Sequence, residues 1–135
     1  MKSLATITRN DIDIIKLALN DSMSDINKEL KEDIKEKKRI ELLDYKNKYL
    51  KVYNKLCQNP SIYSLSETEL DIVAGGLNDA IQLLEEMLTD VEFDAQNKEE
   101  AINMKNDCHR LVELLAGWLL KNQRPLIKSW YNNHR

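Results

Sequence analysis

The side chains of this sequence that could act as nucleophiles or soft metal ligands are few, with two cysteines and two histidines in 135 residues. Cys108 and His109 are adjacent, and because neighbouring residues of a helix point to different faces, they cannot bind one metal ion together. The sequence has no HExxH, CxxC or GxSxG motif and no glycine-rich loop that could cradle a phosphate. These residues therefore predict neither a catalytic nucleophile nor a zinc site.

Acidic residues could instead bind a hard divalent cation. Asp90, Glu92 and Asp94 have the spacing that opens a calcium-binding loop. Such a loop needs a glycine at its sixth position and a glutamate at its twelfth. This chain has Ala95 and Ala101 at those positions, so the pattern does not predict a calcium site.

Two acidic clusters leave one enzymatic alternative open. Glu85, Glu86 and Asp90 form the first cluster, and Glu99 and Glu100 form the second. Paired acids on helices would suit an all-α, metal-dependent nucleotide hydrolase. Because the second cluster lacks a core-facing aspartate one turn further on, this function ranks third. We expect no catalytic residue, no metal ion and no cofactor, and therefore a protein that is not an enzyme.

A ladder of aromatic and basic residues points to binding rather than catalysis. Tyr45, Tyr49 and Tyr53 recur one helical turn apart, with lysines between them at Lys46, Lys48, Lys51 and Lys55. Aromatic rings can stack on bases while ammonium groups hold phosphates, so nucleic-acid binding is the second candidate function. Tyr45 and Tyr49 also fall on the apolar seam of this segment, which favours core or interface positions with their hydroxyls at the rim.

Charge is distributed unevenly along the chain. Residues 28–55 contain ten Lys/Arg and six Asp/Glu, whereas residues 66–107 contain two and twelve. Complementary helix faces that lie side by side, in the monomer or in an oligomer, would explain this. A surface for a basic protein partner, or a mimic of DNA, is the alternative, and the net charge of −3 disfavours nucleic acid itself. The candidate partner-binding residues are Tyr45, Lys48, Tyr49, Lys51, Tyr53, Glu85, Glu86 and Asp90.

An internal repeat indicates which elements position these residues. The pattern of residues 12–23 recurs 58 positions later in residues 70–81, and five positions match without a gap. Thr8, before Asp11, can cap the first segment, and Ser66 with Glu69 forms a capping box before the second. A repeated unit of this length is one supersecondary element whose apolar face packs on its copy.

The spacing of the apolar residues and the small number of glycines and prolines predict the fold. Apolar residues at spacings of three and four are typical of helices, and three glycines and two prolines are too few for a sheet protein of this size. We expect one all-α domain over residues 1–135, a four-helix bundle-like arrangement of two similar αα-hairpins at about 8–58 and 66–122. A short C-terminal helix should follow at about 125–133. A turn or kink is expected between about Lys31 and Lys38, with one long helix as the alternative.

Small residues at matching places predict where the two hairpins cross. Gly75 and Gly76 lie inside a predicted helix, where they should cost about 2 kcal/mol relative to two alanines. Close packing would offset that cost, because Ala18 and Ser22 in the first segment match Gly76 and Ala80 in the second. A kink, a ligand that approaches the backbone, and a helix-turn-helix motif are the alternatives.

Apolar residues off the main stripes predict self-association. Ile14 and Leu17 lie off the apolar stripe of the first predicted helix, which consists of Ile12, Ile15, Leu19, Met23, Ile26, Leu30 and Ile34. Ile40 and Leu43 lie off the apolar seam of the second, which consists of Leu42, Tyr45, Tyr49, Val52 and Leu56. A four-helix bundle covers one broad face of each helix, so these residues would form an exposed apolar patch on a monomer. We therefore expect a homodimer.

The remaining features place the protein in a broad class. Two cysteines in a chain of this size suggest a reducing compartment, with Cys57 and Cys108 as small buried hydrophobes. The N-terminus has no apolar signal segment and no apolar run reaches 18 residues, so we expect a cytoplasmic protein without membrane contact. The composition is typical of bacterial or phage accessory proteins.

The leading functional hypothesis is a non-enzymatic protein-binding regulator, such as an inhibitor, an antitoxin-like factor or an adaptor.

Overall fold

The computed structural model describes residues 4–90, 92 and 94–121 of the chain, and this part is helical without any strand. Its elements are η1 (Leu4–Thr6), α1 (Arg9–Leu30), α2 (Glu36–Gln58), η2 (Ile62–Ser64), α3 (Glu67–Leu88) and α4 (Ala95–Lys121). The all-α, four-helix prediction is confirmed. The short helix predicted at about 125–133 lies outside the described residues.

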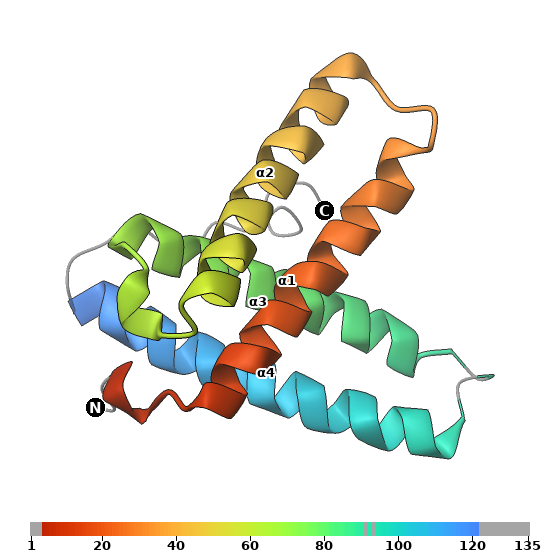
Figure 1. The fold of residues 1–135 in the computed structure, drawn as a ribbon. Coiled ribbons are helices and arrows are strands. Elements are labelled where there is room, and N and C mark those ends of the chain that lie inside the picture. Colours follow the sequence, from red (N-terminus) through yellow and green to blue (C-terminus); the bar gives the residue numbers. More distant parts are fainter. Residues whose placement is uncertain (1–3, 91, 93, 122–135) are drawn as a thin grey trace.

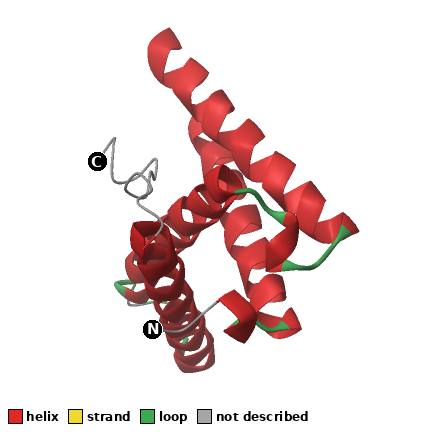
Figure 2. Cartoon of the chain, turned by 90° about the vertical axis from the view of Figure 1, so that its left-hand side faces the viewer, coloured by secondary structure: helices red, strands yellow, loops and turns green. Residues whose placement is uncertain are grey.

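The four helices form two antiparallel hairpins that cross (Figure 1). Helices α1 and α2 run side by side, as do α3 and α4, and the first hairpin lies across the second. The tip where α1 meets α2 extends beyond the α3–α4 pair (Figure 1). Figure 2 shows the same chain from the side, where short loops join the helices. This arrangement leaves an angle between the hairpins, and the candidate site lies in it.

Capping side chains fix where α1 and α3 begin. Thr8 Oγ1 accepts from the backbone N–H of Asp11 at 3.1 Å, and Asp11 Oδ2 accepts from that of Thr8 at 3.0 Å. Ser66 and Glu69 form the same reciprocal pair before α3, at 3.2 and 3.0 Å. Each box satisfies two backbone donors that a helix start leaves unpaired. The capping box predicted at Ser66 is confirmed, and Thr8 with Asp11 also forms a complete one.

The predicted break between the first two helices is confirmed, since α1 ends at Leu30 and α2 begins at Glu36. Arg39 donates to the carbonyl oxygen of Leu30 at 3.0 Å and so satisfies one of the last acceptors of α1. Ile34, which the apolar periodicity assigns to the first helix, lies in the connection instead. The connection contains neither glycine nor proline, so no residue in it marks the end of the helix, and the spacing of four from Leu30 to Ile34 extends the apolar pattern beyond the last helical residue.

The core faces of α1 and α3 have the same spacing. All eight buried positions of α1, from Asp11 to Ile26, correspond to buried positions of α3 when 58 is added to each number. Origin of the two hairpins from one repeated unit stays a prediction from the sequence. Two large apolar side chains of the second hairpin are exposed. Met87 lies at the margin of the buried face of α3, whereas Ile102 lies nine residues before the buried Leu111 and therefore on the opposite side of α4.

The hairpins approach most closely where α1 crosses α3. Ser22 Oγ donates to the carbonyl oxygen of Gly76 at 3.1 Å, and both residues are buried. A Cβ atom on Gly76 would lie 2.6 Å from Leu19 Cδ2 and 3.7 Å from Tyr49 Cε1. Ala18 and Ala80 are buried as well. Gly76 therefore contacts α1 and α2 together, where only a residue without a side chain fits the present packing.

A second polar contact joins α2 to α3 in the core. The hydroxyl of Tyr49 donates to Oδ2 of Asp79, and both residues are buried. The expectation that the Tyr49 hydroxyl would sit at the rim is therefore wrong. The apolar seam of α2 predicted a buried ring, but a carboxylate thirty residues further on supplies the acceptor inside the protein.

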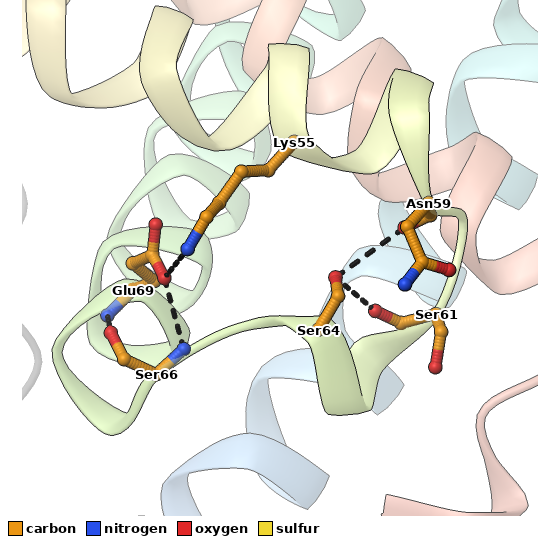
Figure 3. Close-up of polar contacts among 6 residues, drawn as sticks. All are labelled: Lys55, Asn59, Ser61, Ser64, Ser66 and Glu69. Atoms are coloured by element: carbon orange, nitrogen blue, oxygen red, sulfur yellow. Dashed lines mark hydrogen bonds and ion pairs between the residues drawn. The ribbon is translucent and has the colours of Figure 1, made fainter.

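The link between the hairpins is held by polar contacts at the ends of α2 and α3 (Figure 3). Lys55 Nζ lies 2.7 Å from Glu69 Oε1, which joins the last turn of α2 to the first turn of α3. Ser64 Oγ donates to the carbonyl oxygen of Ser61 at 2.7 Å, and it also lies 3.4 Å from the carbonyl oxygen of Asn59. These bonds close the short η2 segment against the end of α2.

The two capping carboxylates each pair with a cation from the other hairpin. Arg110 Nη2 of α4 lies 2.7 Å from Asp11 Oδ1, as Lys55 of α2 does from Glu69. Burial raises the pKa of the Asp11 carboxyl, but the hydrogen bonds from Arg110 and Thr8 lower it more, to below its ordinary 3.8. The pKa of Glu69 is likewise below its ordinary 4.5, because Lys55 and Ser66 outweigh burial.

These depressed pKa values predict how stability depends on pH. A carboxyl whose folded-state pKa is lowered stabilises the fold above its ordinary pKa, and this contribution is lost as the pH falls through the folded value. Asp11→Asn should therefore cost about 1–2 kcal/mol at pH 7 and less at pH 2, where more of the Asp11 carboxyl is protonated. Urea denaturation at both pH values measures this. The exposed Asp13, changed to Asn, is the control; an equal loss from both variants would contradict the prediction.

Candidate protein-binding groove

An open groove of about 900 Å³ lies between α1 and the adjoining ends of α3 and α4. Its walls come from three helices, so residues far apart in the sequence meet there. The larger apolar side chains that line it are Ile14, Leu17, Leu83, Leu84, Met87 and Met104. The small residues Ala80 and Ala101 also line the groove and are buried. Alanine at these two places leaves the volume that larger side chains would fill.

Helix geometry explains why these residues share a wall. Along α1, the lining positions Ile14, Leu17, Asp21, Asp25 and Lys28 follow one another at spacings of three and four, beside the buried stripe of the same helix. Such spacing keeps side chains on one face of a helix. The groove is therefore built from a second face of α1, set against the α3–α4 pair.

Much of the apolar surface in the groove is open. Leu17 is 49% exposed and Met87 is 44% exposed. Exposed apolar side chains that gather in a concave surface usually mark a binding site, whereas scattered ones do not. Methionine adapts its shape easily, because it is unbranched and polarisable. Met87 and Met104 thus allow the groove to fit an apolar ligand of irregular shape.

The groove is strongly acidic. Its lining includes six carboxylate side chains and a single basic one, Lys28; the acids are Asp21, Asp25, Glu86, Asp90, Glu100 and Asp107. Burial raises the pKa of Asp21 above its ordinary 3.8. Asp107 lies 3.5 Å from Arg110 and is partly neutralised by it. A groove that combines apolar and carboxylate side chains favours ligands that carry both apolar and positively charged groups.

The structure separates the candidate residues of the sequence into different places. Ile14, Leu17, Glu86 and Asp90 line the groove together. Glu85 lies beside it, with its Oε1 3.8 Å from Lys105 Nζ. Glu100, named above only as part of an acidic cluster, also lines the groove, and the apolar and acidic groove residues that were not singled out from the sequence are Asp21, Asp25, Leu83, Met104 and Asp107. Their spacing along each helix is visible in the sequence, but only the crossing of the hairpins brings the three faces together.

The remaining candidates lie on α2. Ile40 and Leu43 are exposed on its outer face, and Leu50, which was not among the candidates, is exposed with them. Tyr45 and Tyr53 are half-buried, and Lys51 is exposed. Lys48 Nζ lies 2.9 Å from Asp44 and 5.5 Å from the centre of the Tyr45 ring. Tyr49 is buried and contributes no surface.

The two cysteines differ in exposure. Cys108 is buried, and burial raises the pKa of its thiol to about 12, helped by the charges of Asp107 and Asp21. Cys57 is exposed, which corrects the expectation that both cysteines are buried. It follows the core residue Leu56 directly, and neighbouring positions of a helix face different sides.

This difference predicts the reactivity of the thiols. In the native protein, a thiol-disulfide reagent at pH 8 should modify Cys57 quickly and Cys108 only on unfolding, because the thiolate is the reactive form. Absorbance of the released thiol should show one equivalent in buffer and two in urea. A Cys57→Ser variant is the control and should show none in buffer. Two rapid equivalents from the folded protein would contradict the buried position of Cys108.

The described residues contain no group of three His, Cys, Asp or Glu side chains placed to hold a metal ion. Among the same residues, no helix has the length and apolar character needed to cross a membrane. The chain matches no known protein-family model, no curated protein and no solved structure at a significant level.

Proposed function

We propose that this protein is a non-enzymatic protein-binding regulator, such as an inhibitor, an antitoxin-like factor or an adaptor, and that it binds through the acidic groove. The observation that supports this most is the combination of open apolar side chains, such as Leu17 and Met87, with six carboxylates around them. Apolar contacts provide affinity in such a site, and the carboxylates select the partner by charge.

The ligand that fits this groove best is an amphipathic helix with basic flanks. Helix-in-groove recognition uses apolar anchors at spacings of three, four and seven, which occupy an apolar channel. Lysine or arginine on either side of such anchors would meet the groove carboxylates, among them Asp25 of α1, Glu86 of α3 and Glu100 of α4. Opposite charge also speeds the encounter between the partners, and added salt weakens this effect.

Nucleic-acid binding through α2 is less well supported. Phosphate would be repelled from the acidic groove. Of the three tyrosines on α2 that could stack on bases, Tyr49 is not accessible, because its ring is buried and its hydroxyl donates to the carboxylate of Asp79. Lys48 and Lys55 are paired with Asp44 and Glu69.

Site-specific photo-cross-linking in the cells that naturally make this protein, called the host below, tests the proposal. A benzophenone amino acid at Leu17, in the groove, should form a covalent adduct with one protein other than a second copy of this chain, and the cross-linked segment should be a basic helix. The same amino acid at Tyr63, an exposed position on η2 away from the groove, is the control and should give no such adduct. Adducts from Tyr63 but not from Leu17 would overturn the proposal.

Charge reversal gives the corresponding binding prediction. Glu86→Lys combined with Glu100→Lys changes two groove carboxylates, and should lower the yield of the Leu17 adduct by about tenfold or more. The matched control is Glu92→Lys combined with Glu99→Lys, which makes the same charge change at exposed positions outside the groove. Equal yields from the two variants would show that the groove carboxylates do not select the partner.

A further inference from the structure

The chain itself carries a helix of the kind that its groove would bind. On the outer face of α2, Ile40, Leu43 and Leu50 are each at least 41% exposed and follow one another at spacings of three and seven. Asn47 continues the same line between them. These four residues, called the α2 stripe below, occupy the a and d positions of a heptad pattern. Residues at these positions form the contact surface when helices pack side by side.

Charge on the two surfaces is complementary. Helix α2 contains seven Lys/Arg and three Asp/Glu, a balance of +4. Lys46 and Lys51 flank the α2 stripe on its two sides. The groove contributes six carboxylates and one lysine, and α3, which forms one of its walls, has six acidic residues and no basic one. The two surfaces would attract each other over the distances at which proteins first meet.

The lengths of the two surfaces also agree. From Ile40 to Leu50, the α2 stripe is about 15 Å long at 1.5 Å per residue. The wall that α1 gives to the groove, from Ile14 to Lys28, is about 21 Å long by the same measure. The apolar part of the stripe can therefore lie within the groove, with the flanking lysines at its rim.

A single chain cannot make this contact with itself. The opposite face of α2 is fixed in the core by Leu42, Tyr49, Val52 and Leu56, all of them fully or almost fully buried. The α2 stripe therefore points away from its own core and its own groove. A second copy of the chain has to supply the helix.

We propose that two copies of this protein dock reciprocally, each placing its α2 stripe in the groove of the other. A reciprocal contact of this kind generates a closed two-fold dimer, because the same two surfaces are used on both subunits. The proposal rests on the proposed function of the groove and adds a regulatory consequence. The dimer covers the groove, so a partner protein must compete with the second copy, and dissociation opens the binding site.

The test uses two full-length variants that each destroy one of the two surfaces. The stripe variant is Leu43→Glu with Leu50→Glu, and the groove variant is Leu17→Glu with Met87→Glu. All four side chains are exposed, so both variants should keep the helical circular dichroism of the wild type. Light scattering at high micromolar concentration should give twice the chain mass of 15.8 kDa for the wild type and a single chain mass for each variant.

Mixing the two variants then decides how the surfaces pair. The groove of the stripe variant and the α2 helix of the groove variant are both intact, so the mixture should form a heterodimer through one remaining contact. A groove variant that stays dimeric would mean that two α2 stripes pair with each other. A stripe variant that stays dimeric would mean that two grooves pair. Either result overturns the proposal, as does a monomeric wild type or a mixture without heterodimer.

Photo-cross-linking separates this proposal from the function on which it rests. In purified wild-type protein, the benzophenone group at Leu17 should attach to residues 36–58 of the second copy. If purified protein gives no adduct, while the host gives an adduct with a different protein, reciprocal docking is wrong and the proposed function stands. If neither gives an adduct, both proposals are wrong.

Discussion

Gly76→Leu should destabilise the protein by at least about 3 kcal/mol, and so prevent most of the chain from folding at 37 °C. Even the first atom of a new side chain would lie 2.6 Å from Leu19 Cδ2, and Leu19 is fully buried. The remaining atoms would extend toward the Tyr49 ring, whose Cε1 lies 3.7 Å from the same position. Helices α1 and α2 would both have to move away from α3, which would also break the Ser22 bond to Gly76.

Gly117 provides the matched control for this substitution. A Cβ atom there would meet nothing within 4 Å, although the residue also lies inside a helix. Gly117→Ala should therefore stabilise the protein by about 0.5–1 kcal/mol, because alanine favours the helix and restricts the unfolded chain. Thermal unfolding followed by circular dichroism measures both changes. Similar midpoints for Gly76→Leu and the wild type would show that the helices do not cross closely at Gly76.

Tyr49→Phe should lower the free energy of unfolding by about 2–3 kcal/mol, although it removes only one oxygen atom. The hydroxyl of Tyr49 donates to the carboxylate of Asp79, which is buried at 2% exposure. Without this donor, the carboxylate loses a hydrogen bond that replaces its hydration, and the loss is larger for a charged acceptor than for a neutral one. The contact also joins α2 to α3, so the loss loosens the crossing of the hairpins.

Urea denaturation at pH 7 checks this second expectation. Tyr63→Phe serves as the control, because Tyr63 is exposed and its variant should stay within about 0.5 kcal/mol of the wild type. The double variant Tyr49→Phe with Asp79→Leu should recover part of the loss, since it removes the buried carboxylate as well as its donor. Equal stability of Tyr49→Phe and Tyr63→Phe would mean that the buried hydrogen bond contributes nothing to the fold.

Local signals in the sequence predicted where helices begin, which of their faces are buried and where the hairpins cross. Ser66 with Glu69 specifies a helix start by its own hydrogen bonds, whatever the rest of the chain does. The stripe spacing identified the buried faces of α1 and α3, and small residues at Ala18, Ser22, Gly76 and Ala80 indicated a place for close approach. These features depend on neighbours within one or two helical turns.

The groove could not be predicted in the same way. Periodicity shows that Ile14 and Leu17 share a face of α1, but not which faces of α3 and α4 lie opposite. Met87 is exposed, because the angle between the hairpins leaves that end of α3 uncovered on one side. The acceptor of the Tyr49 hydroxyl was missed for the same reason, since Asp79 lies on another helix. Contacts between helices are set by their packing angles.

Methyl NMR of the methionines tests directly whether the groove receives a helix. The stripe variant, labelled with ¹³C at its methionine methyl groups, has Met87 and Met104 in an unoccupied groove and Met23 in the core as an internal control. On addition of the unlabelled groove variant, whose α2 stripe is intact, the signals of Met87 and Met104 should shift and that of Met23 should not. Unchanged Met87 and Met104 signals at high micromolar concentration, or an equal shift of Met23, would contradict the assignment of this groove as a binding surface for a helix.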